Sequence, residues 1–134
     1  LASTEADIFT LRGAQDAELI DGSIGELSPF HQTFNYYAHG VAVNTAMLPM
    51  GWRERLVLVE SPATGGARGF CLDVHDLAAS KLAAGRDRDL DYVRLLLQHR
   101  LVQGPLLLER VDALEAPPAH QAAARARLKR ILGT

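Results

Sequence analysis

Apolar and polar positions follow two different periods along the chain. Residues 5–8 alternate acid, apolar, acid, apolar, and this period of two predicts a short strand with one carboxylate-bearing face. The apolar run at 56–59 has the length of another strand, and Pro62 with the two glycines at 65–66 predicts a turn before a further strand at 69–72. We expect these last two strands to form a hairpin.

Weaker signals lie between the first strand and the apolar run. An apolar stripe at 16–24 favours a helix. Ser28 followed by Pro29 is typical of a helix start, so we expect a short helix to about Phe34. Residues 36–43 should be extended, and their aromatic side chains should pack inside.

From residue 73 the spacing of apolar residues becomes helical. Asp73 and Asp87 are the expected N-caps of two helices separated at Gly85, and the apolar stripe of the second runs to Leu101. Prolines mark the starts of two further helices. The patterns together predict an α+β fold, with a small mixed sheet followed by a C-terminal helical bundle.

Composition agrees with a single domain over 1–134, strand-rich over about 1–72 and helical over about 73–134. The chain has 134 residues, 48% of them hydrophobic, which suffices for one core and not for two ordinary domains. A formal net charge of −2 excludes an overall positive charge that would bind nucleic acid without specificity.

No apolar stretch is long enough to cross a membrane. The single cysteine, Cys71, fits a buried small hydrophobe in a reducing cytoplasm.

The acid pair in the first predicted strand is the first candidate for chemistry. Glu5 and Asp7 are two residues apart, so both carboxylates face the same side of a strand and can share a divalent cation. Phosphoryl and nucleotidyl transfer need such a cation to neutralise triphosphate charge. The alternative is an ordinary solvated strand face, because acid-x-acid triplets are common.

The second candidate is a charged block in the helical half. Arg86 with Asp89 fits a surface ion pair at i,i+3 spacing, which contributes only a few tenths of a kcal/mol. Lys81 stands alone among leucines and alanines. Its ammonium group therefore either reaches water or meets an anion, for which Asp7, Glu5 and Asp89 are the candidates.

Three segments, STEADIF at 3–9, DGSIGELSPFHQTFNYYAHGV at 21–41 and CLDVHDLAASKLAAGRDRDLDYVRLLL at 71–97, carry a family resemblance. They resemble an uncharacterised group of bacterial nucleotidyltransferase-like proteins, related to the toxins of abortive-infection toxin–antitoxin pairs. The wider superfamily includes DNA polymerase beta. Its members have a Gly-Ser or Gly-Gly turn before the first strand, whose backbone amides hold the triphosphate. This chain begins after that position, without a methionine, so we expect an upstream part to be missing.

The resemblance implies roles for particular residues. Glu5 and Asp7 become catalytic metal ligands, Lys81 a catalytic phosphate contact, and Mg²⁺ or Mn²⁺ the cofactor. Glu60 is the best-placed third metal-binding carboxylate, with a surface acid at a strand end as the alternative. Further nucleotide contacts are implied at Ser3, His31, Arg86 and Asp89, although a histidine among aromatic residues is more often structural.

The implied function is metal-dependent transfer of a nucleoside monophosphate from a nucleoside triphosphate to an acceptor. The acceptor is left open among a tRNA, a protein and a small molecule, and the chain would be the toxin of a toxin–antitoxin pair. One alternative is a catalytically inactive module of the same fold that binds a nucleotide or a protein partner such as an antitoxin. Another is a purely structural helical domain. A cytoplasmic protein without a membrane partner is expected, and a homo-oligomer is an open alternative to a monomer.

Overall fold

The computed structural model describes residues 3–11, 16–42, 44, 46–60, 62 and 68–133. The chain divides into two compact units, an N-terminal unit of residues 1–46 and a C-terminal unit of residues 47–134. Helices and two small sheets are both present, so the predicted α+β class is confirmed. The single domain expected over 1–134 stays a prediction. Within the described ranges, no helix has the length and apolar character that crossing a membrane requires.

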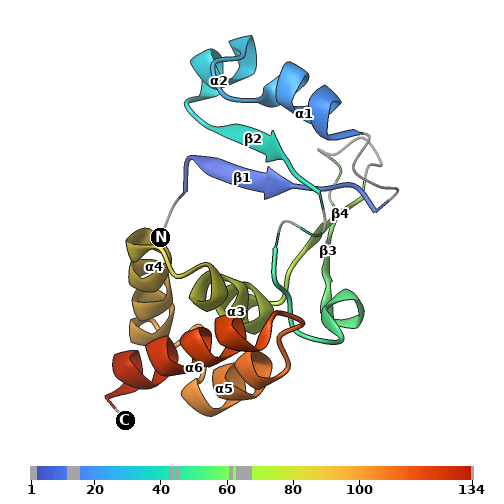
Figure 1. Cartoon of the computed structure of the whole chain (residues 1–134). Helices are drawn as coiled ribbons and strands as arrows, with labels where there is room; N and C mark the ends of the chain where they lie inside the picture. Colours follow the sequence, from blue (N-terminus) through green and yellow to red (C-terminus); the bar gives the residue numbers. More distant parts are fainter. Residues whose placement is uncertain are drawn as a thin grey trace. The chain divides into compact units, whose positions relative to one another are not determined.

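The N-terminal unit consists of two parallel strands and two helices. Strand β1, Glu5–Ile8, pairs with β2, Tyr37–Gly40, and the connection between them contains α1, Ala17–Ile24, and α2, Pro29–Phe34 (Figure 1). The pairing is parallel because the long connection with its helices returns the chain to the end of the sheet at which β1 starts, so β2 runs in the same direction. The predicted first strand and both helices are confirmed, and the extended segment expected at 36–43 is confirmed over Tyr37–Gly40, with residue 43 outside the described residues.

Helix α1 packs closely on β2. A Cβ added at Gly40 would lie 2.2 Å from the carbonyl oxygen of Ala17, so only glycine permits this approach. The backbone N–H of Gly40 donates to Asp21 Oδ1 at 2.8 Å, which ties the same helix to the strand. These contacts fix the face of the sheet that α1 covers.

The aromatic side chains near α2 do not pack inside as expected. Of the two aromatic residues at 36–43, Tyr37 is half-buried and Tyr36 is 51% exposed. Tyr36 stacks on the surface against Phe34, which is 52% exposed, and against Phe30, with ring centroids 4.8–6.0 Å apart among the three. The expectation of burial was wrong for Tyr36 because two strands and two short helices leave too little interior to enclose large rings.

The C-terminal unit begins with a short 3₁₀ helix, η3, Trp52–Arg55, followed by a hairpin. Strand β3, Val57–Val59, pairs antiparallel with β4, Gly69–Cys71. The predicted hairpin is therefore confirmed. Cys71 is exposed on β4, so the expectation of a buried thiol was wrong. A two-stranded hairpin has no second layer to cover the side chains on both of its faces.

Four helices complete this unit: α3, Val74–Ala84; α4, Asp87–Gln98; α5, Gly104–Asp112; and α6, Pro118–Leu132. The helical half predicted from residue 73 is confirmed. Two details differ from the sequence prediction. The N-cap of α4 is Arg86 rather than Asp87, and Leu101 lies beyond the end of α4 with 51% of its surface exposed.

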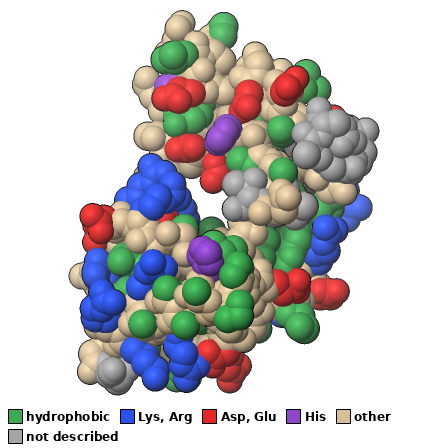
Figure 2. All heavy atoms as spheres, viewed as in Figure 1, with side chains coloured by type: hydrophobic (Ala, Val, Ile, Leu, Met, Phe, Trp, Pro, Cys, Tyr) green, Lys and Arg blue, Asp and Glu red, His purple; other side chains and the backbone are tan. Residues whose placement is uncertain are grey.

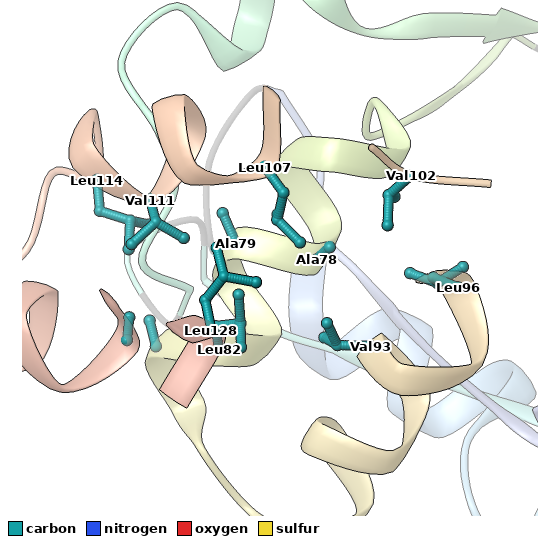
Figure 3. Close-up of a cluster of buried hydrophobic side chains, with 12 residues drawn as sticks. Ala78, Ala79, Leu82, Val93, Leu96, Val102, Leu107, Val111, Leu114 and Leu128 are labelled. Carbon is teal, nitrogen blue, oxygen red and sulfur yellow. The ribbon is translucent and has the colours of Figure 1, made fainter. Parts of the chain in front are cut away.

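The hydrophobic core of this unit lies between α3 and the three helices packed around it (Figure 3). The alanines Ala78 and Ala79 of α3 are fully buried, and their small size lets the neighbouring helices approach closely. The larger side chains at the centre come from all four helices and are also fully buried: Leu82, Val93, Leu107, Val111 and Leu128. Burying each such side chain contributes about 1.5–3 kcal/mol.

Replacing Gly85 with alanine should lower the free energy of unfolding of this unit by about 1–2 kcal/mol. Gly85 ends α3 with a φ of 70°, a left-handed conformation that disfavours a Cβ. The new Cβ would also lie 2.2 Å from the guanidinium carbon of Arg127. Arg127 donates to the carbonyl oxygens of Leu82 and Ala83 at 2.7 and 3.2 Å, so its displacement would leave the end of α3 without these partners.

Urea unfolding followed by the fluorescence of Trp52, the single tryptophan of the chain, measures this loss. Gly133→Ala is the matched control, because Gly133 ends α6 with a φ of 77° and an added Cβ there meets nothing within 4 Å. The control should lose only the part that comes from the backbone conformation. A Gly85→Ala protein as stable as the unchanged chain would contradict the prediction.

Candidate metal centre

Two carboxylates and one imidazole converge on the strands of the N-terminal unit. His39 Nδ1 lies 3.6 Å from Asp7 Oδ1 and 3.9 Å from Glu5 Oε1. Ligand atoms of all three residues lie within 4.8 Å of one another. Among the residues that the structure describes, these three form the one group of acidic, histidine or cysteine side chains close enough together to hold a metal ion.

The strand pairing explains the convergence. Glu5 and Asp7 point to the same side of β1 because side chains alternate along a strand. In the parallel register Glu5 lies opposite Tyr37 and Asp7 opposite His39, which places these side chains on one face. Ala6 and Gly40 belong to the other face, where α1 packs. The sheet thus has one polar face and one apolar face, which α1 covers at β2 while Ile8 of β1 is exposed.

The side chains of the cluster are accessible. The exposed fractions are 34% for Glu5, 59% for Asp7 and 54% for His39. At the position of β1 and β2, Figure 2 shows acidic side chains gathered around a histidine on the visible surface. A ligand can therefore reach all three groups from solvent.

An open pocket of about 300 Å³ adjoins the cluster. Its acidic side chains are Glu5, Asp21 and Glu26, and the lining is completed by Tyr37, Ala38 and His39. Asp21 accepts the Gly40 backbone N–H, which holds that carboxylate at the pocket wall. The lining therefore includes three acidic residues beside the histidine, a composition that favours cations over anions.

Ser3 and His31, two residues expected to contact nucleotide, serve the local structure of this unit. The Ser3 hydroxyl donates to the backbone carbonyl oxygen of Glu5 at 2.8 Å and accepts its N–H at 3.3 Å. His31 Nδ1 accepts the backbone N–H of Leu27 at 2.9 Å, and its ring lies 4.7 Å from that of Tyr37. His31 thus supports a pocket-lining residue, and nucleotide contact by Ser3 or His31 stays a prediction.

Lys81, Arg86 and Asp89 form a network in the C-terminal unit. The Asp89 carboxylate is 1% exposed, accepts from Arg86 Nε at 2.7 Å and lies 3.5 Å from Lys81 Nζ. Asp89 also accepts the Arg86 backbone N–H at 3.2 Å and so caps the start of α4. Lys81 Nζ lies 5.8 Å from the centroid of the Tyr92 ring.

The charge of Asp89 is strongly stabilised by these neighbours. Burial alone would raise the pKa of Asp89, but hydrogen bonds from the Arg86 side chain and backbone, together with the charge of Lys81, hold that pKa below its usual value. The expectation of an ordinary surface pair between Arg86 and Asp89 was therefore wrong. Of the three candidate anions for Lys81, Asp89 is the one that Lys81 contacts within the C-terminal unit. The expected cleft shared by Lys81 with Glu5 and Asp7 stays a prediction.

Glu60, the candidate third carboxylate, follows β3 directly and is exposed. Within the ranges that the structure describes, Glu60 is part of no group of three or more metal-binding side chains. Its metal-binding role stays a prediction. The position closest to Asp7 across the paired strands is occupied by His39 instead.

Sequence reasoning did not identify the buried ion network around Asp76. The Asp76 carboxylate has no exposed surface, accepts from Arg55 Nε at 2.8 Å and from Arg110 Nη1 at 2.9 Å. Arg110 also donates to Asp73 at 2.9 Å. Burial would raise the pKa of Asp73, but the backbone N–H groups of α3 and the Arg110 side chain hold it below its usual value. The sequence signal for this network is weak, because the arginine and the aspartate of each pair are 21–37 residues apart.

Comparison with known proteins gave one informative result. The model of a protein family described as nucleotidyltransferase of unknown function (DUF6036) matches residues 7–124, most of the chain. No curated protein matches the chain, and no solved structure does. The matched range includes Asp7 and His39 of the cluster on β1 and β2, as well as Lys81, Arg86 and Asp89.

Proposed function

This chain belongs to that family of nucleotidyltransferases, and on this basis we propose that it transfers a nucleoside monophosphate from a nucleoside triphosphate to an acceptor, with a divalent cation held by Glu5 and Asp7. The convergence of these two carboxylates on one accessible strand face carries the proposal. Family membership supplies the reaction class, and the cluster supplies a place for the cation that the reaction needs.

The donor set fits a divalent cation such as Mg²⁺ or Mn²⁺. Carboxylate oxygens are the ligands that these hard ions prefer in proteins. The ligand atoms lie within 4.8 Å of one another, so small rotations of exposed side chains bring them to a common ion. The exposure of Glu5 and Asp7 leaves the remaining coordination positions for phosphate oxygens and water.

The acidity of the neighbouring pocket is a second argument for a cation. Glu5, Asp21 and Glu26 would repel a polyphosphate that arrived alone. A cation held by Glu5 and Asp7 would offset part of this charge and would stabilise the oxygens of an in-line displacement. In the proposed reaction an acceptor oxygen bonds to the α-phosphorus and loses its proton. The bond from that phosphorus to the bridging oxygen breaks, and pyrophosphate leaves with the electron pair.

For the C-terminal unit by itself, Lys81 is proposed as a phosphate contact. Lys81 is partly exposed, and its ammonium group retains donors that are free to turn from Asp89 to a phosphate. Asp89 holds both Lys81 and Arg86, so it positions these cations rather than contacting nucleotide itself. The acceptor is proposed to be a tRNA, a protein hydroxyl or a small molecule, and the test below makes no assumption about which it is.

Asp7→Asn should weaken Mn²⁺ binding to the full chain at least about tenfold, the scale expected when a metal site loses a ligand or its support. The substitution removes a charge and keeps the volume of an exposed side chain, so the free energy of unfolding should stay within about 0.5 kcal/mol. Electron paramagnetic resonance of Mn²⁺ measures binding. Transfer of label from α-phosphate-labelled nucleoside triphosphates into acceptors of a cell extract measures activity, and the same variant should abolish it.

The matched control is Asp91→Asn, which makes the same chemical change at a carboxylate that is 69% exposed on α4. This control should leave Mn²⁺ binding and label transfer unchanged. Equal Mn²⁺ affinity in the Asp7→Asn variant and the unchanged chain would rule out Asp7 as a ligand. Undiminished label transfer in that variant would exclude the proposed reaction at this site.

A further inference from the structure

We propose that His39 is the third ligand of this cation site and makes it selective for transition-metal ions, such as Co²⁺ and Zn²⁺, over Mg²⁺. The inference rests on the proposed function in one respect, since it concerns the same cation. It adds a residue and a metal preference that neither the acid pair nor the family description specifies. Three independent features of His39 support it.

The first feature is distance. Ions of this class bind nitrogen and oxygen ligands at about 2.0–2.2 Å, so two ligand atoms of one ion lie at most about 4.4 Å apart. His39 Nδ1 lies 3.6 Å from Asp7 Oδ1 and 3.9 Å from Glu5 Oε1. Both separations are already inside that limit without any change of the backbone. The imidazole nitrogen is therefore within the distance of each carboxylate that a shared ion requires.

The second feature is the rigidity of the placement. His39 lies opposite Asp7 in the parallel register, and the next residue, Gly40, is fixed by its close contact with Ala17 and its hydrogen bond to Asp21. A shift of the register by one residue would turn His39 to the α1 face. The packing of α1 on β2 therefore holds the imidazole on the same side as the carboxylates.

The third feature is the exposure of His39. Its side chain is 54% exposed, in contrast to Ala38 beside it, which is 5% exposed. Among the described residues, the side chains that His39 Nδ1 approaches within ion-pair distance are the two carboxylates. His31 differs in this respect, because its ring nitrogen accepts a backbone N–H and its ring stacks on Tyr37.

Ligand chemistry then determines the metal preference. Mg²⁺ favours oxygen ligands and retains its waters, whereas imidazole nitrogen suits later first-row ions. Replacing one oxygen of a three-carboxylate site by nitrogen therefore lowers the relative affinity for Mg²⁺ and raises it for Co²⁺ and Zn²⁺. With two carboxylates and one imidazole from the protein, solvent-facing positions remain for substrate oxygens.

The test compares metal binding by the full chain and two variants of His39. Co²⁺ binding is followed by its visible absorption, and Mg²⁺ binding by competition against Co²⁺. His39→Gln should weaken Co²⁺ binding at least about tenfold and change Mg²⁺ binding much less, because it removes only the imidazole nitrogen. His39→Asp should strengthen Mg²⁺ binding relative to Co²⁺, since it restores an all-carboxylate set. Both substitutions are at an exposed side chain, and urea unfolding checks that the fold is kept.

His120→Gln is the matched control, because His120 is exposed on α6 and the substitution is the same. It should leave both affinities unchanged. An unchanged ratio of Co²⁺ to Mg²⁺ affinity in His39→Gln would overturn the inference. The proposed function would still stand if Asp7→Asn lowered both affinities, and it would fail together with the inference if Asp7→Asn also left them unchanged.

Discussion

Replacing Asp76 with alanine is expected to lower the free energy of unfolding of the C-terminal unit by about 3–5 kcal/mol. The Asp76 carboxylate has no exposed surface and accepts hydrogen bonds from both Arg55 and Arg110. The substitution leaves two guanidinium groups, 29% and 17% exposed, without the carboxylate between them. The penalty is large because charges removed from water have lost their compensating partner.

Urea unfolding followed by Trp52 fluorescence measures this effect, since Trp52 belongs to η3, the same short helix as Arg55. Asp91→Ala is the matched control. It removes a carboxylate that pairs with Arg94, but those side chains are 69% and 54% exposed, so the expected loss is below about 1 kcal/mol. A loss for Asp76→Ala no larger than that of the control would show that the buried network contributes little to stability.

Leu107→Ala is expected to have the second large effect, a loss of about 2–5 kcal/mol. Leu107 is fully buried in α5 and belongs to the cluster formed by the four helices (Figure 3). Its loss removes apolar contacts and leaves a cavity between α5 and α3, which surrounding side chains fill only in part. The same unfolding experiment gives the change in free energy.

Leu101→Ala provides the comparison, because Leu101 lies in the same unit with 51% of its surface exposed. Its replacement should cost less than about 0.5 kcal/mol, as expected for a surface position. Similar losses in the two variants would mean that Leu107 is not at the centre of a tightly packed core. A reduced slope of unfolding against urea in Leu107→Ala would instead indicate a change in compactness.

Several features followed from the sequence because they depend on residues near one another in the chain. The alternation at 5–8 predicted β1 and the common face of Glu5 and Asp7, since the side-chain period of a strand is local. Asp73 and Gly85 marked the limits of α3 through capping and left-handed backbone geometry. The resemblance in three segments predicted the nucleotidyltransferase family, which the match over 7–124 confirms.

Other predictions failed where burial decided the outcome. Tyr36, after α2, and Cys71 were expected inside, but each lies in or beside a two-stranded sheet that has too few neighbouring residues to enclose it. Asp89 was expected on the surface, yet α4 turns its carboxylate inward to the start of its own helix. Hydrophobicity along a sequence gives a tendency for burial, while the number of layers that meet at a residue decides it.

The cluster of Glu5, Asp7 and His39 shows what only the tertiary structure decided. Glu5 and Asp7 were identifiable from their spacing, but His39 follows Asp7 by 32 positions in the numbering and reaches it only because β1 and β2 are parallel and in one particular register. Asp76 likewise meets Arg55 and Arg110 from two distant segments. Local sequence determined which faces carry carboxylates and where helices begin and end. The pairing of strands and the packing of helices determined which cation or imidazole each carboxylate meets, because those contacts join residues that no short period relates.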